Sequence, residues 1–204
     1  MMQKVRNVRR TLIIAAACLP LLVALFYFVY RPWQLNWGAT EEEIQRTMAG
    51  DEIVPNPTFN ATRAVTVNAP PERIWPWLVQ MGYRKAGFYS WDILDNDGIP
   101  SAERIIPEYQ TLKVGDLMPL TARQGTRVAA MVPNKELLLV TQSDVVWTWS
   151  WGLYPIDAHR TRLVSRLRVP LRTFSSQLWV DAFEIVMMRK CLLGIKRRAE
   201  VKDE

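Results

Sequence analysis

RAVTVNAPPERIWPWLVQMG, residues 63–82, changes its hydrophobic period halfway along its length. Residues 61–67 alternate between the two sides of an extended chain and are rich in β-branched residues, which predicts a strand. Asn-Ala-Pro-Pro-Glu then opens a helix, because Pro71 suits a first helical turn. Apolar residues follow at helical spacing at Ile74, Trp77, Leu78 and Met81. A strand that leads directly into an amphipathic helix is therefore expected.

Four more strands are expected downstream of this unit, at residues 126–132, 136–142, 145–153 and 161–169. Turn-forming residues join the first two strands, and the segment Ile-Asp-Ala-His at 156–159 joins the last two. Links this short predict an antiparallel meander. Between residues 82 and 119 the periodicity is poor, and only residues 102–106 suggest a short helix.

The C-terminal region, residues 175–201, is expected to form one long helix. It begins with serines and ends with Lys196, Arg197 and Arg198, which suit the negative end of a helix dipole. Its apolar residues cover more than one narrow stripe. A helix of this kind packs against neighbours on more than one side.

The order of these elements resembles the START/Bet v 1-like, or SRPBCC, superfamily, which includes polyketide cyclases and lipid-transfer domains. The segments that carry the resemblance are RAVTVNAPPERIWPWLVQMG, AGFYSWDIL (86–94), LKVGD (112–116) and FEIVMMRKCLLGIKRRAE (183–200). They look like a membrane-anchored bacterial branch of it and span about residues 60–200. The resemblance implies an α+β helix-grip fold, in which a curved antiparallel sheet wraps on a long C-terminal helix with a hydrophobic cavity between them. It leaves the activity open, because the superfamily contains both binding proteins and enzymes.

The N-terminal region contains a predicted transmembrane helix. Residues 11–30, TLIIAAACLPLLVALFYFVY, carry no charge, and at ~1.5 Å per residue they span a ~30 Å hydrocarbon core. Four basic residues precede this run and Arg31 alone follows it closely. The positive-inside tendency predicts a single-pass membrane protein with a cytoplasmic N-terminus and an extracytoplasmic domain.

Two alternatives to this anchor are a cleaved signal peptide and a lipoprotein signal ending at Cys18, both supported only by Ala15, Ala16 and Ala17. Cleavage there would leave an apolar segment on the mature protein. The predicted organisation is therefore a basic flank (1–10), an anchor (11–30), a tether with a short helix near residues 40–48 (31–59) and a helix-grip domain (60–201).

The charge of the chain is concentrated at its N-terminus. Residues 1–31 contain five basic residues and no acid, which accounts for five of the six net positive charges. The domain lacks the basic surface that nucleic-acid binding requires, so no nucleic-acid partner is expected. The oligomeric state is left open.

Residues for several kinds of catalysis are missing. His159 is the only histidine and falls in a predicted turn, so Ser-His-Asp and Cys-His schemes and histidine-rich metal sites are not expected. The sequence has no glycine-rich phosphate loop or dinucleotide motif. We therefore predict no metal, no cofactor and no assigned catalytic residue, and no disulfide between Cys18 and Cys191.

The candidate binding residues come from two regions. Trp147, Trp149 and Trp151 alternate along a predicted strand and share one face, where they form either packed core or a cavity wall. Phe183 and Met187 on the C-terminal helix would complete the wall. The segment around residues 88–104 supplies a possible cavity mouth through Tyr89, Trp91, Asp92 and Arg104. The alternative for that segment is an ordered loop in which Asp92 or Asp95 caps a helix and Arg104 forms a surface salt bridge.

Three functions are compatible with this pattern. The first is the binding of a hydrophobic or amphipathic small molecule, or a lipid, at a membrane. The second is a cyclase/dehydratase-type enzyme in which Asp92, Tyr89 or Arg104 acts in general acid–base catalysis. The third is a protein-interaction or chaperone-like module, which a contiguous exposed apolar patch would favour.

Overall fold

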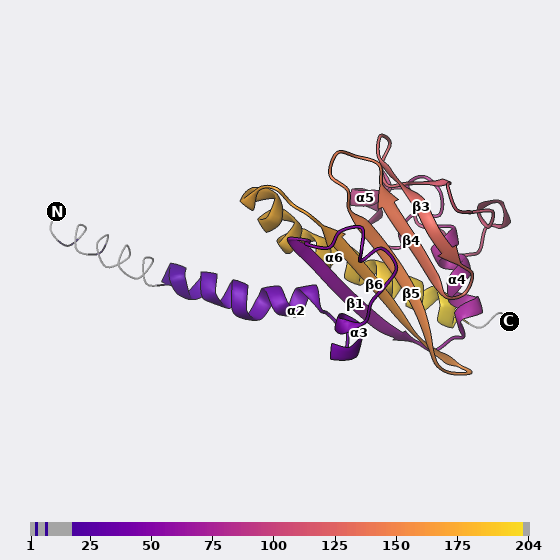
Figure 1. Ribbon diagram of the computed structural model, residues 1–204, viewed down its shortest axis with the longest axis horizontal. Coiled ribbons are helices and arrows are strands. Elements are labelled where there is room, and N and C mark those ends of the chain that lie inside the picture. Colours follow the sequence, from indigo (N-terminus) through magenta and orange to yellow (C-terminus); the bar gives the residue numbers. More distant parts are fainter. Residues whose placement is uncertain (1–2, 4–6, 8–17, 202–204) are drawn as a thin grey trace. The chain divides into compact units, whose positions relative to one another are not determined.

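A computed structural model describes residues 3, 7 and 18–201 (Figure 1). The chain divides into two compact units, Met1–Gln34 and Leu35–Glu204. In the first unit the backbone is helical from Cys18 onward and includes the π-helical segment η1 (Phe26–Tyr30) and the start of α2 (Arg31–Leu35). The predicted span begins earlier, and its residues 11–17 lie outside the described residues.

The helix over Cys18–Leu35 is long and apolar enough to cross a membrane, and most of its side chains are exposed. A signal sequence can have the same length and composition, and so can a core helix of a soluble protein. The described residues thus contain one candidate membrane span, near the N-terminus.

The second unit is built on a six-stranded antiparallel sheet with the order β1-β6-β5-β4-β3-β2. Its strands are β1 (Phe59–Val67), β2 (Leu117–Pro119), β3 (Gly125–Val132), β4 (Glu136–Thr141), β5 (Thr148–Asp157) and β6 (Arg160–Val169). The five predicted strands are confirmed. The sixth, β2, was not predicted because three residues are too few to show a period.

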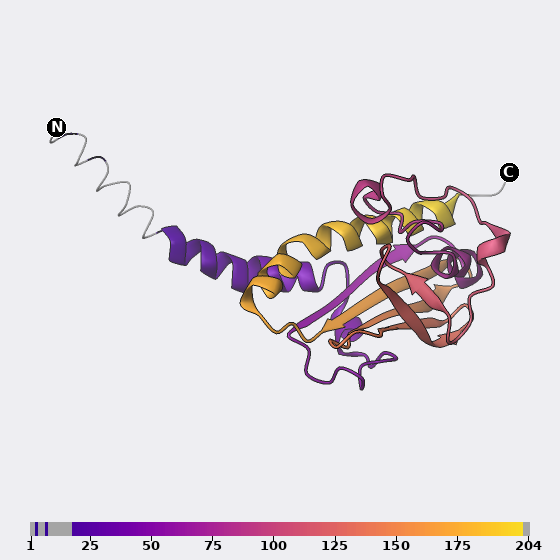
Figure 2. The same ribbon diagram turned by 90° about the horizontal axis from the view of Figure 1, so that it is seen from above.

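The long C-terminal helix α6 (Phe174–Glu200) lies across one face of this sheet, where α4 (Pro71–Val79) also packs (Figure 2). The core between them contains fully buried side chains from the sheet and both helices, including Trp151, Leu163, Ile74, Leu78, Leu192 and Ile195. This arrangement confirms the predicted α+β fold class.

The prediction of a helix at residues 102–106 is wrong. The regular turns of this region are α5 (Asp92–Asp95) and the 3₁₀ helix η2 (Pro107–Tyr109). The fully buried side chain of Gln80 donates to the carbonyl of Arg104 at 3.2 Å and accepts from the amide of Ile106 at 2.9 Å. These bonds occupy backbone groups that a helix would pair internally.

Residues 35–58, assigned to a tether by sequence, belong to the same compact unit and cover the other face of the sheet. They include the short helix α3 (Glu41–Gln45), which Thr40 and Glu43 begin with a reciprocal capping box. Since successive β6 side chains point to opposite faces, Arg162 and Arg166 reach this segment while Leu163 and Leu167 face α6.

Candidate functional site

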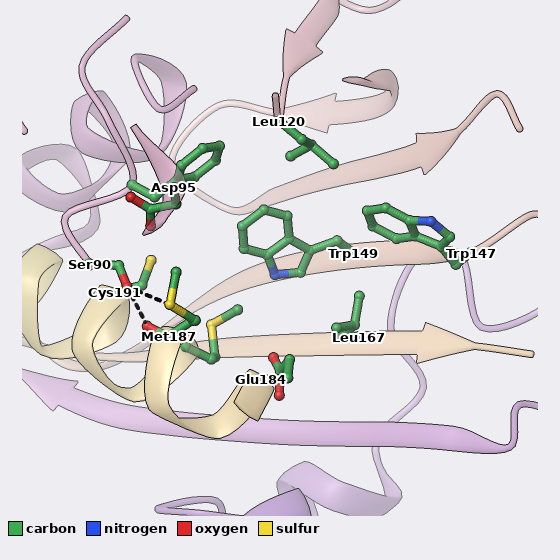
Figure 3. A pocket seen from close by; sticks show the side chains of 11 residues that line it. Ser90, Asp95, Leu120, Trp147, Trp149, Leu167, Glu184, Met187 and Cys191 are labelled. Atoms are coloured by element: carbon green, nitrogen blue, oxygen red, sulfur yellow. Dashed lines mark hydrogen bonds between the residues drawn. The ribbon is translucent and has the colours of Figure 1, made fainter. Parts of the chain in front are cut away.

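A pocket of about 220 Å³ lies between the sheet and α6 (Figure 3). The sheet side contributes Trp147, Trp149 and Leu167. The helix side contributes Glu184, Met187, Met188 and Cys191. The connecting segments complete the lining with Phe88, Ser90, Asp95 and Leu120.

Trp149 is the central wall of the pocket. It is 7% exposed, and its ring centroid lies 5.1 Å from that of Trp151 and 6.3 Å from that of Phe88. Its indole Nε1 donates a hydrogen bond to the Ser165 hydroxyl at 2.9 Å. Leu167 is its register partner on β6. Because the indole Nε1 of Trp149 is hydrogen-bonded within the sheet, Trp149 presents an apolar ring surface to the pocket.

Asp95, at the end of α5, places a carboxyl group against this apolar surface. Its Oδ1 atom is buried and has no hydrogen-bond partner among the described residues. Burial raises the pKa of Asp95 to about 6, and repulsion by Asp92 adds to the shift. Across the pocket, burial also raises the pKa of the Cys191 thiol, with smaller contributions from Asp95 and Glu184.

Glu184 is the second carboxyl group of the pocket, and a buried cation compensates it. The guanidinium of Arg63 on β1 is 1% exposed and forms an ion pair with Glu184. Burial raises the pKa of Glu184, although the attraction of Arg63 opposes this shift. The two acids of the pocket therefore differ, because Glu184 forms an ion pair with Arg63 and Asp95 forms none with a guanidinium of the described residues.

Three of the nine sequence-predicted site residues line the pocket, namely Trp147, Trp149 and Met187. Trp151 lies behind Trp149 in the core and is 1% exposed. Phe183 was placed wrongly in the cavity wall: it is half exposed on α6, and its ring lies 4.2 Å from that of the exposed Trp179. The helix turns Glu184 and Met187 toward the sheet instead.

The other four predicted residues do not line this pocket. The Tyr89 hydroxyl is buried and donates to the carbonyl of Trp77 at 3.0 Å, and Asp92 accepts from the Ser101 hydroxyl at 2.5 Å. Trp91 lies on the surface under the ammonium of Lys190, 3.6 Å from the ring centroid, and Arg104 is exposed. The segment still borders the pocket, but through Phe88, Ser90 and Asp95 rather than through these four residues.

The backbone conformation of this segment explains the position of Tyr89. Tyr89 has φ +58°, and its carbonyl packs so closely on Gly194 that a Cβ there would lie 2.3 Å away. The close approach fixes the loop against α6 and turns the Tyr89 ring under the guanidinium of Arg198, which lies 4.7 Å from the ring centroid. Tyr89 is thus held in the packing between the loop and the helix.

Asp95 and Glu184 were the important residues that the sequence analysis did not select. Glu184 had a usable signal, because it interrupts the apolar run of the C-terminal helix between Phe183 and Ile185. Asp95 was considered only as a helix cap, because nothing in the local sequence indicates that its carboxyl group meets a pocket. The described residues contain no group of three histidine, cysteine or acidic side chains placed to hold a metal ion.

Exposed apolar side chains also occur outside the pocket. The first half of α6 carries four of them, at Leu178, Trp179, Phe183 and Val186, and α5 carries Ile93 and Leu94. Large exposed aromatic groups of this kind are characteristic of contact surfaces.

No family model matches the chain, and neither does any curated protein. Among solved structures, it is similar to EF2215 from Enterococcus faecalis, a conserved protein of unknown function, at 16% identity over 71% of this chain and 73% of that one, with a TM-score of 0.46. It is also similar to DynU16 from the dynemicin biosynthetic locus, at 14% identity over 71% and 51% of the two chains, with a TM-score of 0.46. The KanY protein matches at 9% identity over 72% and 99%, with a TM-score of 0.48. Likenesses at this level say nothing about a ligand or a reaction.

Proposed function

We propose that this chain binds a hydrophobic or amphipathic small molecule in the pocket between the sheet and α6. The observation that carries the proposal is the pocket itself, whose walls are tryptophan, phenylalanine, leucine and methionine side chains with a few polar groups among them. Its volume of about 220 Å³ is below the ~300–1,000 Å³ typical of drug-sized ligands. The ligand is therefore a small molecule or one end of a longer amphiphile.

The test uses the neutral fluorescent probe N-phenyl-1-naphthylamine with the full chain in mild detergent. Trp147→Ala is expected to weaken binding about tenfold, because one pocket-facing aromatic surface is worth roughly 1.4 kcal/mol or more. Trp91→Ala is the matched control, since Trp91 is an exposed tryptophan that does not line the pocket. Equal losses in the two variants, or no probe binding by the wild type, would contradict the proposal.

A cyclase/dehydratase-type enzyme is the second candidate, and Asp95 is the observation that favours it. A carboxyl group with a pKa of about 6 beside an apolar pocket has the properties of a general acid or base. This candidate requires turnover of a bound ligand that is lost in Asp95→Asn while the ligand still binds.

An interaction module is the third candidate, and the exposed aromatic groups of α6 favour it. This function would depend on Trp179 and Phe183, which lie outside the pocket. Replacing both with serine would then abolish partner binding and leave the binding of the naphthylamine probe unchanged.

We further propose that binding takes place at a membrane, with the N-terminal helix as a single-pass anchor and the domain outside the cytoplasm. The supports are the apolar helix Cys18–Leu35 and the basic residues that precede it. Reporters fused after Glu204 are expected to be active only on the extracytoplasmic side, and alkaline carbonate is expected to leave the chain in the membrane. Cytoplasmic reporter activity would refute the orientation, and a shortened mature N-terminus would support the signal-peptide alternative.

A further inference from the structure

The charge of the pocket restricts its ligand, and we propose that the ligand is a hydrophobic amine whose ammonium group pairs with Asp95 while its apolar part lies against Trp149 and Trp147. This inference rests on the proposed binding function and specifies the ligand class. The proposal follows from which ionisable side chains line the pocket and from whether a cation of the protein neutralises the charge of each one.

The ionisable side chains that line the pocket are Asp95, Glu184 and Cys191. Of the described residues, no lysine, arginine or histidine lines it. A fatty acid or another anion would place its charge beside two carboxyl groups in a medium of low dielectric constant, where like charges repel strongly. A cationic ligand would instead be attracted by the same two carboxyl groups.

The two carboxyl groups are not equally available to a cation. Glu184 already pairs with the buried guanidinium of Arg63. Both Glu184 oxygens and Asp95 Oδ1 are buried without a hydrogen-bond partner among the described residues, so the two acids differ in that only Glu184 has an ion pair. A buried carboxylate oxygen without a donor is costly, and a ligand ammonium would supply both the donor and the opposite charge.

The protein's own cations near Asp95 leave it largely uncompensated. The ammonium of Lys190 lies over the Trp91 ring, and its attraction is the smallest contribution to the pKa of Asp95. Arg123, on the loop between β2 and β3, is exposed and does not line this pocket; it lines a neighbouring pocket together with Asp95, but no ion pair within 4.0 Å joins the two among the described residues. Burial raises the pKa of Asp95 to about 6, as expected for a carboxyl group that lacks a close cation.

The walls suit the remainder of such a ligand. Trp149 and Phe88 present ring surfaces to the pocket, and aromatic faces attract cations as well as apolar groups. Met187 and Met188 offer flexible, polarisable surfaces that adapt to ligand shape. An apolar group a few carbons away from an ammonium matches this combination.

Three ligands that share one apolar part test the proposal: 4-phenylbutylamine, 4-phenylbutanol and 4-phenylbutanoate. Their affinities are measured by calorimetry with the full chain in one mild detergent at pH 7.5, where Asp95 is ionised. The amine is expected to bind at least tenfold more tightly than the alcohol, and the carboxylate most weakly. In Asp95→Asn the preference for the amine over the alcohol should disappear while the affinity for the alcohol stays within twofold.

The control variant is Asp97→Asn, because Asp97 is an exposed carboxylate two residues away whose partners are Arg84 and Tyr83. It is expected to keep the preference for the amine. Asp95→Asn should remain folded. The pKa of Asp95 is raised from 3.8 to about 6 in the folded chain, so ionisation of this group lowers the stability of the wild type as the pH rises from about 4 through 6, and asparagine removes that cost. Its melting temperature at pH 7.5 is expected to be at or above that of the wild type.

Lowering the pH from 7.5 to 5 should also weaken amine binding, because Asp95 is protonated in this range and loses its charge. The other titratable or charged groups around it are Asp92 on its own helix, Glu184, Lys190 and Cys191 on α6, and Arg123 on the loop. Asp95→Asn is expected to abolish this pH dependence. That result would show that the titration of Asp95, and not of these neighbours, weakens amine binding.

The outcomes separate the two proposals. If the alcohol binds but the amine is not preferred, or if Asp95→Asn keeps the preference, the amine inference is overturned and the binding function stands. If none of the three ligands binds to the wild type, the binding function fails.

Discussion

Arg166→Met is expected to lower the free energy of unfolding by about 3–5 kcal/mol, because it removes one partner of a buried ionic network. The Arg166 side chain is 2% exposed and points from β6 to the face of the sheet that residues 35–58 cover. A guanidinium has five N–H donors. Each of them has an acceptor here: the Thr62 hydroxyl, the Asp51 carboxylate and the carbonyls of Glu43, Ile44 and Arg46.

Methionine would fill much of the space but would leave these buried oxygens without donors. Three of them are carbonyls at the end of α3, so the segment that covers the sheet should loosen first. Arg166→Lys keeps the charge with three donors and no planar fork, and an intermediate loss is expected. Thermal melting of the full chain measures the effect, and at ~2–4 °C per kcal/mol the midpoint for Arg166→Met should fall by roughly 6–20 °C.

Arg160→Met is the control on the same strand. Arg160 is half exposed and pairs with Asp157 at 2.7 Å within a turn, so its loss should leave the melting temperature nearly unchanged. A fall in Arg166→Met no larger than in Arg160→Met would show that the covering segment contributes little to stability.

Trp149→Ala is expected to cost about 3 kcal/mol, near the lower end of the ~3–5 kcal/mol for large aromatic truncations. The side chain packs on Trp151 and Phe88 and bonds to Ser165, but one side of it already borders the pocket. The truncation therefore enlarges an existing cavity. Trp149→Phe keeps a ring and loses only the bond to Ser165, so it should cost less.

A ligand distinguishes the wall of a cavity from plain core. Saturating 4-phenylbutanol should restore part of the melting temperature lost in Trp149→Ala, because a ligand that fills the enlarged pocket stabilises the folded state. Trp151→Ala should lose at least as much stability without this rescue, since Trp151 is buried and does not line the pocket. An unchanged melting temperature and unchanged ligand binding in Trp149→Ala would exclude Trp149 from both roles.

Much of the fold could be predicted because its signals are local. Alternation in residues 61–67 predicted β1, and alternation in 145–153 put the tryptophans on one face. The helix ends followed from Pro71 and from the basic residues that close α6. Two features had no reliable local signal. The strand β2 is too short to show a period, and the predicted helix at residues 102–106 does not form because Gln80, which is distant in sequence, bonds to the backbone there.

The candidate site could be predicted from the sequence more readily on its sheet side than on α6. A period of two decides the face of a strand, and of the three tryptophans that share this face Trp147 and Trp149 line the pocket. On α6 a change of one position turns a side chain by about 100°, and the broad apolar surface of this helix did not reveal which residue meets the sheet. Of the two residues chosen on α6, Met187 lines the pocket and Phe183 does not, and Glu184, which also lines it, was not chosen.

The sequence by itself determined the nature and order of the main strands and helices, the apolar N-terminal run and the common face of the tryptophans, because each depends on neighbours along the chain. Tertiary structure alone decided that Arg63 of β1 compensates Glu184 of α6 and that Asp95 stands without such a partner. These contacts arise when β1 pairs with β6 and α6 packs across the sheet, which brings distant segments together. The charge of a buried carboxyl group depends on those distant neighbours and on the water they exclude, so no local pattern encodes it.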